Sequence, residues 1–195
     1  GRRSLAVQAD VSQSSEVSRM VDQAIQRFGA VDILVNNAGI VIPAFITDLT
    51  EKDWDQTMRV NLKSMFLCSK AVAPIMMEQQ FGKIVIVSSR SGTRGGLWLT
   101  AYCASKFGVI GFTQSLAMDL APYGINVNAI CPGPVYTTLW DNVLKEAYAR
   151  KQNLDVEDVK DYYISKVPLG REVTLEEIGN IVVFLCSDES NYMTG

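Results

Sequence analysis

Two hydrophobic periods alternate along the chain. Apolar residues three and four positions apart predict a helix over residues 14–28, which Ser14 or Ser15 caps and Gly29 ends. Short apolar runs without this spacing predict buried strands, because a strand covered on both faces is apolar at successive positions. We expect these strands at residues 5–8, 31–35, 84–87 and 125–130.

Two long helical patterns separate the last three strands. The first covers residues 50–79, where Thr50 and Asp53 form a variant of the capping box and Pro74 predicts a kink. The second covers residues 101–121 and is followed by a proline and a glycine, which typically end a helix.

The last third of the chain carries a polar insert and a final helix. Residues 138–169 show no strand pattern and are expected to be partly helical, and Thr174 and Glu177 then form a capping box. Parallel strands need crossovers of one hand, and these place helices on both faces of the sheet. We therefore expect one α/β domain over residues 1–195, with a doubly wound parallel sheet.

Composition narrows what such a domain can do. The 195 residues carry a net charge of -3, which argues against nucleic-acid or anionic-membrane partners because both need a basic face. The absence of histidine excludes Ser-His-Asp triads and His-ligated zinc. No apolar run reaches the roughly 18 residues of a membrane span. Scattered cysteines predict reduced thiols, no metal and a cytoplasmic location; they are Cys68, Cys103, Cys131 and Cys186.

Polar motifs follow three successive strands, at the sheet edge where open α/β folds bind ligands. Each motif alone is commonly a turn, a strand end, a solvated pair or a loop, but their joint order indicates one site. Tyr102 and Lys106 stand four residues apart on one face of the helix that follows Ser89. The strand-end motifs are Asn36-Asn37-Ala38-Gly39, Ser88-Ser89 and Pro132-Gly133-Pro134-Val135-Tyr136-Thr137.

Tyr102 is well suited to proton transfer in a protein without histidine. Oxidation of an alcohol removes the hydroxyl proton while a hydride leaves the carbon. A phenol does this only when its pKa of about 10 is lowered, and a nearby Lys106 ammonium favours the phenolate. Ser89 would donate a hydrogen bond to the substrate oxygen, where negative charge develops.

These motifs resemble those of the short-chain dehydrogenase/reductases, and the resemblance runs from Asp10-Val11 to the C-terminal Tyr192-Met193-Thr194-Gly195. It implies a Rossmann-like fold and an NAD(P)-dependent oxidoreductase. The implied catalytic residues are Asn61, Ser89, Tyr102 and Lys106, with Asn61 holding a water that relays protons. The implied cofactor-binding residues are Asp10, Val11, Asn37, Ala38, Gly39, Tyr102, Lys106, Pro132, Gly133, Val135 and Thr137.

The chain departs from the family at its two ends. The sequence lacks the glycine-rich turn that binds the pyrophosphate, and it also lacks the family's first two strands and its last strand. We therefore expect a sheet that is truncated at both ends. The residue that distinguishes NAD from NADP belongs to that missing part. Either dinucleotide therefore fits, with a slight preference for NAD.

A small secondary alcohol or polyol and its ketone are the expected substrates, from a weak likeness to polyol and acetoin dehydrogenases. Ser89, Ser91, Tyr102, Trp98 and Trp140 are the candidate substrate contacts, although packing alone explains the two tryptophans equally well. Arg90 and Arg94 are further candidates, although arginines in such a loop are more often solvated surface charges than ligands. The alternatives are a non-catalytic scaffold or binding protein retaining the fold, or an epimerase or dehydratase.

A homodimer or homotetramer is implied by the resemblance. Helices 50–79 and 101–121 carry more apolar surface than one sheet face buries, with the alternative that all of it is internal core. Examples are Met58, Leu62, Phe66, Phe107 and Phe112.

Overall fold

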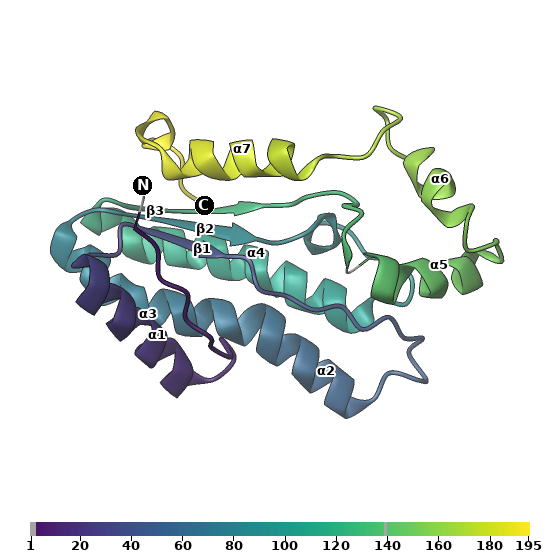
Figure 1. The fold of residues 1–195 in the computed structure, drawn as a ribbon, viewed down its shortest axis with the longest axis horizontal. Helices are drawn as coiled ribbons and strands as arrows, with labels where there is room; N and C mark the ends of the chain where they lie inside the picture. The colour runs from purple at the N-terminus through teal and green to yellow at the C-terminus, as the bar shows by residue number, and fades with distance from the viewer. Residues whose placement is uncertain (1–2, 139) are drawn as a thin grey trace.

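The computed structural model describes residues 3–138 and 140–195 and centres on a parallel sheet of three strands (Figure 1). The strands are β1 (Ile33–Asn36), β2 (Gly82–Val87) and β3 (Ile125–Ile130), in the order β1-β2-β3. The register aligns Leu34 with Ile84 and Ile84 with Val127. The three strands therefore end at one edge of the sheet, as the sequence predicted.

Helices cover both faces of this sheet. On one face, α1, α3 and α4 bury Val21, Met76 and Val109 against Ile84 and Ile86. On the other face, α7 packs on β2 and β3. The predicted doubly wound α/β arrangement is confirmed. The bounds of these helices are α1 Ser14–Phe28, α3 Ser64–Gln79, α4 Thr100–Leu120 and α7 Leu175–Cys186.

The helix expected over residues 50–79 is interrupted. Thr50 caps α2 (Glu51–Met58) as predicted, with its hydroxyl accepting a bond of 3.1 Å from the backbone N–H of Asp53. A π-helical turn, η1 (Arg59–Lys63), then separates α2 from α3. Pro74 lies inside α3, so the irregular turn of this segment stands at 59–63 and not at the proline.

The start of α1 corrects a second expectation. Neither Ser14 nor Ser15 is the cap: both are already helical, and the N-cap is Gln13, whose side chain makes no capping bond. The end of the helix is as predicted, because Gly29 adopts a left-handed conformation with φ of 88°.

The predicted strand at residues 5–8 is wrong. The segment has no ladder, and one of its carbonyls, that of Gln8, accepts a bond of 2.7 Å from Arg19 Nη2 instead. A strand is stabilised by a neighbour, and the described segments provide none here. β1 is consequently an edge strand, with Ile33 45% and Val35 42% exposed, where the apolar run predicted burial on both faces.

The insert forms short helices beyond the carboxyl ends of the strands, and the described part of residues 138–169 contains no strand, as predicted. The elements of the insert are η4 Trp140–Leu144, α5 Lys145–Gln152 and α6 Val159–Ile164. Three short turns lie elsewhere in the chain: η2 Arg90–Gly92 after β2, η3 Ala121–Tyr123 between α4 and β3, and η5 Asp188–Ser190 after α7. Within the described chain, no helix has both the length and the apolar character needed to cross a bilayer.

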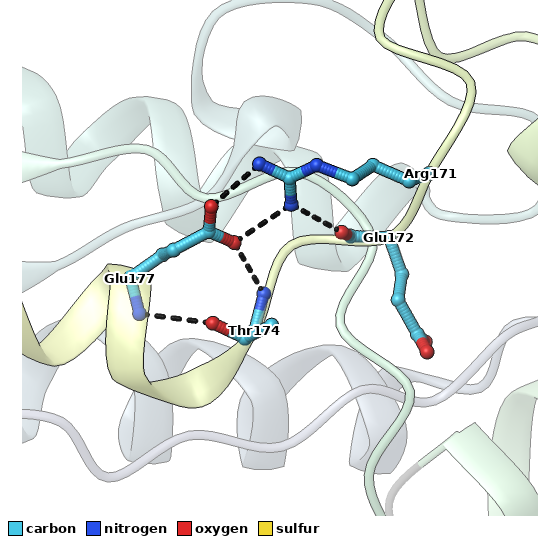
Figure 2. A network of polar contacts seen from close by, with 4 residues as sticks. All are labelled: Arg171, Glu172, Thr174 and Glu177. Carbon is cyan, nitrogen blue, oxygen red and sulfur yellow. Dashed lines mark hydrogen bonds and ion pairs between the residues drawn. The ribbon is translucent and has the colours of Figure 1, made fainter.

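A polar network fixes where α7 begins (Figure 2). Thr174 and Glu177 form the predicted capping box, and Arg171 contacts the Glu177 carboxylate with both terminal nitrogens, at 2.6 and 2.9 Å. The Arg171 bonds are the main reason that the pKa of Glu177 falls to about 2. The first turn of α7 is thereby held in one place, and Leu175 and Ile178 of this helix line the cavity described next.

Candidate active site

A cavity of about 310 Å³ opens where the predicted motifs meet. Its wall combines the loops after β1, β2 and β3 with α4, the insert and α7. Ser89, Tyr102 and Lys106 all line it. The structure therefore brings together three side chains that are up to 17 positions apart in sequence, counting from 89 to 106.

Ser89 and Lys106 are held by neighbouring backbone. Ser89 caps η2, with its Oγ accepting from the N–H of Ser91 at 3.0 Å. Lys106 is 3% exposed, and its Nζ donates to the carbonyl of Val87 at 2.9 Å. The same Nζ lies 5.8 Å from the centre of the Tyr102 ring. The ammonium thus lies beside the phenol, with its orientation set by the end of β2.

The pKa of Tyr102 corrects the expectation of an acidic phenol. Burial raises the pKa of this hydroxyl, while a hydrogen bond with Ser89 opposes the rise. Burial also lowers the pKa of Lys106 to about 8. Both shifts have one cause, since a buried wall disfavours phenolate and ammonium alike. The surroundings described here therefore favour a protonated Tyr102.

Asn61 holds in place a loop that lines the cavity. It is buried in the π-helical turn, and its Nδ2 donates to the carbonyl of Ile40 at 2.9 Å and to Ser105 Oγ at 3.0 Å. Its Oδ1 accepts from the N–H of Ile40 at 2.8 Å. Both amide hydrogens are used by protein atoms, so the side chain joins the loop after β1 to α4. A water relay through this residue stays a prediction.

The residues predicted to bind the cofactor divide into two groups. Most line the cavity: Asn37, Gly39, Tyr102, Lys106, Pro132, Gly133, Val135 and Thr137. Ala38 and Val11 are not among the lining residues, and Asp10 lines a separate hollow beside α1.

Gly39, in the loop after β1, leaves a space open beside Lys106. A methyl group at Gly39 would lie 3.4 Å from Asn61 Oδ1 and 3.6 Å from Lys106 Nζ, so glycine keeps open a space that any side chain would fill. The residues present therefore fit the nicotinamide half of a dinucleotide.

The predicted substrate contacts are placed in different ways. Ser91 and Trp140 line the cavity. Trp140 also belongs to a buried core cluster, which confirms packing, and its contact with substrate stays a prediction. Trp98 is not among the lining residues; it adopts a left-handed backbone with φ of 61°, and its carbonyl accepts from Ala44. Arg90 lines the cavity, while Arg94, four residues on, is exposed outside it.

An aromatic wall closes the side formed by the insert. Trp140, Tyr148 and Tyr163 line the cavity, and the ring centres of Tyr148 and Tyr163 are 4.9 Å apart. The ring centre of Trp140 is 4.6 Å from that of Tyr136, which precedes the insert and is not among the lining residues. The apolar residues that line the cavity were not identified from the sequence. The signal that could have found them is the apolar character of the strand-end loops and of α7. These residues are Ile40, Val41, Leu99, Leu144, Leu175 and Ile178.

Comparison with known proteins decides the family. A family model described as "Enoyl-(Acyl carrier protein) reductase" matches residues 1–195. A (2S)-[(R)-hydroxy(phenyl)methyl]succinyl-CoA dehydrogenase subunit of Thauera aromatica is 38% identical over 195 residues, which are 100% of this chain and 73% of that protein. The chain belongs to the short-chain dehydrogenase/reductase family. As a member of that family, it is an NAD(P)-dependent oxidoreductase.

Solved structures of family members agree with this assignment. A xylitol dehydrogenase bound to NAD+ is 33% identical, with a TM-score of 0.88 over 95% of this chain and 74% of the other. An actinorhodin polyketide ketoreductase with NADPH is 34% identical, with a TM-score of 0.92 over 95% of this chain and 72% of the other. The two neighbours thus hold different dinucleotides on one fold.

Proposed function

We propose that this dehydrogenase interconverts a small secondary alcohol or polyol and its ketone, with Tyr102 as the general acid and base. The observation that carries the proposal is that Ser89, Tyr102 and Lys106 line one cavity. Tyr102 passes its hydroxyl proton to the substrate oxygen in reduction and takes it back in oxidation. A bound nicotinamide supplies or accepts the hydride.

The neighbouring side chains prepare this proton transfer. Ser89 donates a hydrogen bond to the substrate oxygen as its negative charge develops. The Lys106 ammonium, 5.8 Å from the ring centre, stabilises the phenolate that is left when Tyr102 gives up its proton. Asn61 acts through its bonds to Ile40 and Ser105, which hold the loop after β1 against α4.

The proposals for cofactor, assembly and location are those of the sequence analysis. We retain a slight preference for NAD over NADP, and a dimer or tetramer in the cytoplasm. The scaffold alternative has no use for a buried lysine beside a tyrosine in a cavity, so the site favours an enzyme. An epimerase or dehydratase would use the same pair of side chains and is separated only by assay.

Turnover is tested with the full-length protein, NAD or NADP, and a panel of polyols, acetoin and their ketones, by the absorbance of reduced nicotinamide. We expect Tyr102→Phe to lower kcat by roughly 10²–10⁴-fold, because the variant loses the proton donor alone. Circular dichroism of the variant should match the wild type. Full activity in Tyr102→Phe would remove this residue from the mechanism, and no turnover with any pair would overturn the proposed reaction.

A further inference from the structure

The cavity carries an imbalance of charge. Arg90 and Lys106 are the cationic residues on its wall, and no aspartate or glutamate is among the described residues that line it. Lys106 already donates to Val87 and stands beside Tyr102. Arg90 is different, since no ion pair or side-chain hydrogen bond of its guanidinium occurs within the described part of the chain.

The backbone of Arg90 is fixed immediately after Ser89. Its N–H donates to the carbonyl of Pro132 at 2.9 Å, and its carbonyl accepts from the hydroxyl of Thr93 at 2.9 Å. The side chain is half-buried and starts from the short helix η2 that Ser89 caps. Arg90 is therefore held at a set place next to the serine that we expect to contact the reacting oxygen.

The guanidinium lies on the aromatic side of the cavity. Its positive charge acts on Tyr148 and Tyr163 of the insert and on Tyr136 in the loop after β3, and opposes the rise that burial causes in the pKa of each hydroxyl. The charge also reaches Lys151, whose Nζ is already held by the carbonyl of Leu97 at 3.1 Å. Arg90 therefore lines the cavity close to the aromatic residues of the insert.

A half-buried arginine without an acid partner keeps the donors of its guanidinium available to an anion. Its planar fork donates parallel hydrogen bonds, which match the two oxygens of a carboxylate or phosphate. Neutral polyols provide no such partner. An anionic group on the substrate would satisfy the guanidinium and, at the same time, fix which carbon stands at Ser89 and Tyr102.

We propose that Arg90 binds a carboxylate or phosphate group carried by the substrate, and so makes this dehydrogenase selective for anionic hydroxy or oxo compounds. Trp140, Tyr148 and Tyr163 then pack against the uncharged body of the substrate. The inference rests on the proposed function, because it assigns the substrate class for the same site.

The first test compares matched pairs of substrates in the full-length enzyme. One pair is a short 3-oxocarboxylate and its neutral methyl ester, and the other is a ketose phosphate and the free ketose. We expect Arg90→Gln to lower the ratio of kcat/KM for the charged to the neutral member by roughly 10–100-fold, mainly through KM. The pair that shows the drop tells carboxylate from phosphate.

Two further variants serve as controls. Arg94→Gln removes an equal charge from the same loop but outside the cavity, so the ratio should remain as in the wild type. Arg90→Lys keeps the charge without the planar fork and should give an intermediate ratio. An unchanged ratio in Arg90→Gln, or a wild-type enzyme that prefers the neutral members, overturns the proposal.

A binding measurement separates this inference from the proposed reaction. Malonate and inorganic phosphate are titrated calorimetrically into wild type, Arg90→Gln and Arg94→Gln. Binding that is lost only in Arg90→Gln supports the anion site even if no alcohol is turned over. Equal binding in wild type and Arg90→Gln, or no binding of either anion in the wild type, contradicts it whether or not the enzyme is active.

Discussion

The buried amine of Lys106 is the most constrained charge of the site. Its Nζ is tied to the carbonyl of Val87, and its pKa is about 8 because burial disfavours the ammonium. Tyr102 is shifted in the opposite direction by the same burial. Below about pH 8 both groups hold their protons, which is the state that ketone reduction needs.

A pH profile tests this reading of Lys106. For ketone reduction we expect kcat/KM to be level below about pH 8 and to fall as the pH rises through about 8, where the buried ammonium loses its proton. Initial rates with the reduced cofactor across this range provide the measurement. Lys106→Arg, whose guanidinium stays charged, should lose the fall in whatever activity remains. A wild-type profile without a decline above pH 8 contradicts the assignment.

The spacing of residues in the sequence predicted the positions of those side chains that depend on a single helix. The four-residue spacing of Tyr102 and Lys106 on a helix sets their common face, so sequence was sufficient to place them together. The sequence was not sufficient to place Trp98, because its left-handed backbone depends on the conformation of one loop. The raised pKa of Tyr102 also lay beyond sequence, because burial depends on elements that are distant in the chain.

A close contact between η2 and α4 holds Ser89 and Lys106 near each other. Gly92 is buried, and a Cβ there would lie 2.6 Å from the carbonyl oxygen of Lys106 and 2.6 Å from Ser88 Oγ. Ser88 Oγ also donates to that carbonyl at 3.1 Å. The loop bearing Ser89 and the helix bearing Lys106 therefore touch backbone to backbone.

Gly92→Ala should separate these elements. The added methyl group meets backbone that cannot rotate away, so we expect a loss of about 1–3 kcal/mol in the free energy of unfolding and a reduced kcat. Gly95→Ala is the matched control in the loop after η2, since a Cβ there meets nothing within 4 Å. Denaturant unfolding and initial rates check both; wild-type stability and rate in Gly92→Ala would refute the close contact.

Element boundaries followed the same division between local and distant causes. The capping box of Thr174 and the left-handed Gly29 were predictable because both depend on a few adjacent residues. The strand at residues 5–8 did not form, because a strand depends on a neighbour and the expected absence of the first two strands leaves this segment without one among the described residues. The same dependence left Ile33 exposed on β1.

Across the whole molecule, apolar side chains remain on the outer faces of α3 and α4. Phe66 is 44% and Phe107 47% exposed, and a hollow beside them is lined by Met58, Leu62 and Phe112. The order of elements was predictable from the sequence because the crossover rule leaves few topologies. How the chain assembles was not, because the same apolar pattern serves an internal core or a second subunit.

Replacing Phe66 and Phe107 by serine tests the proposed assembly. If these helices pair with a second copy, the double variant loses apolar area at the interface and should shift the sedimentation coefficient toward that of a monomer. Leu169→Ser, at an exposed position of the insert outside α3 and α4, should leave the assembly as it is. A wild-type protein that sediments as a monomer would exclude this interface.

The π-helical turn at residues 59–63 determines whether this region tolerates the insertion or deletion of a residue. Each residue rotates an α-helix by about 100°, so loss of one residue here would restore regular winding while swinging α2 away from its present direction. Asn61 would then no longer reach Ile40 and Ser105 together. A regular α-helix over this segment is therefore incompatible with the Asn61 hydrogen bonds that connect the loop after β1 to α4. These bonds determine the number of residues between Thr50 and Ser64.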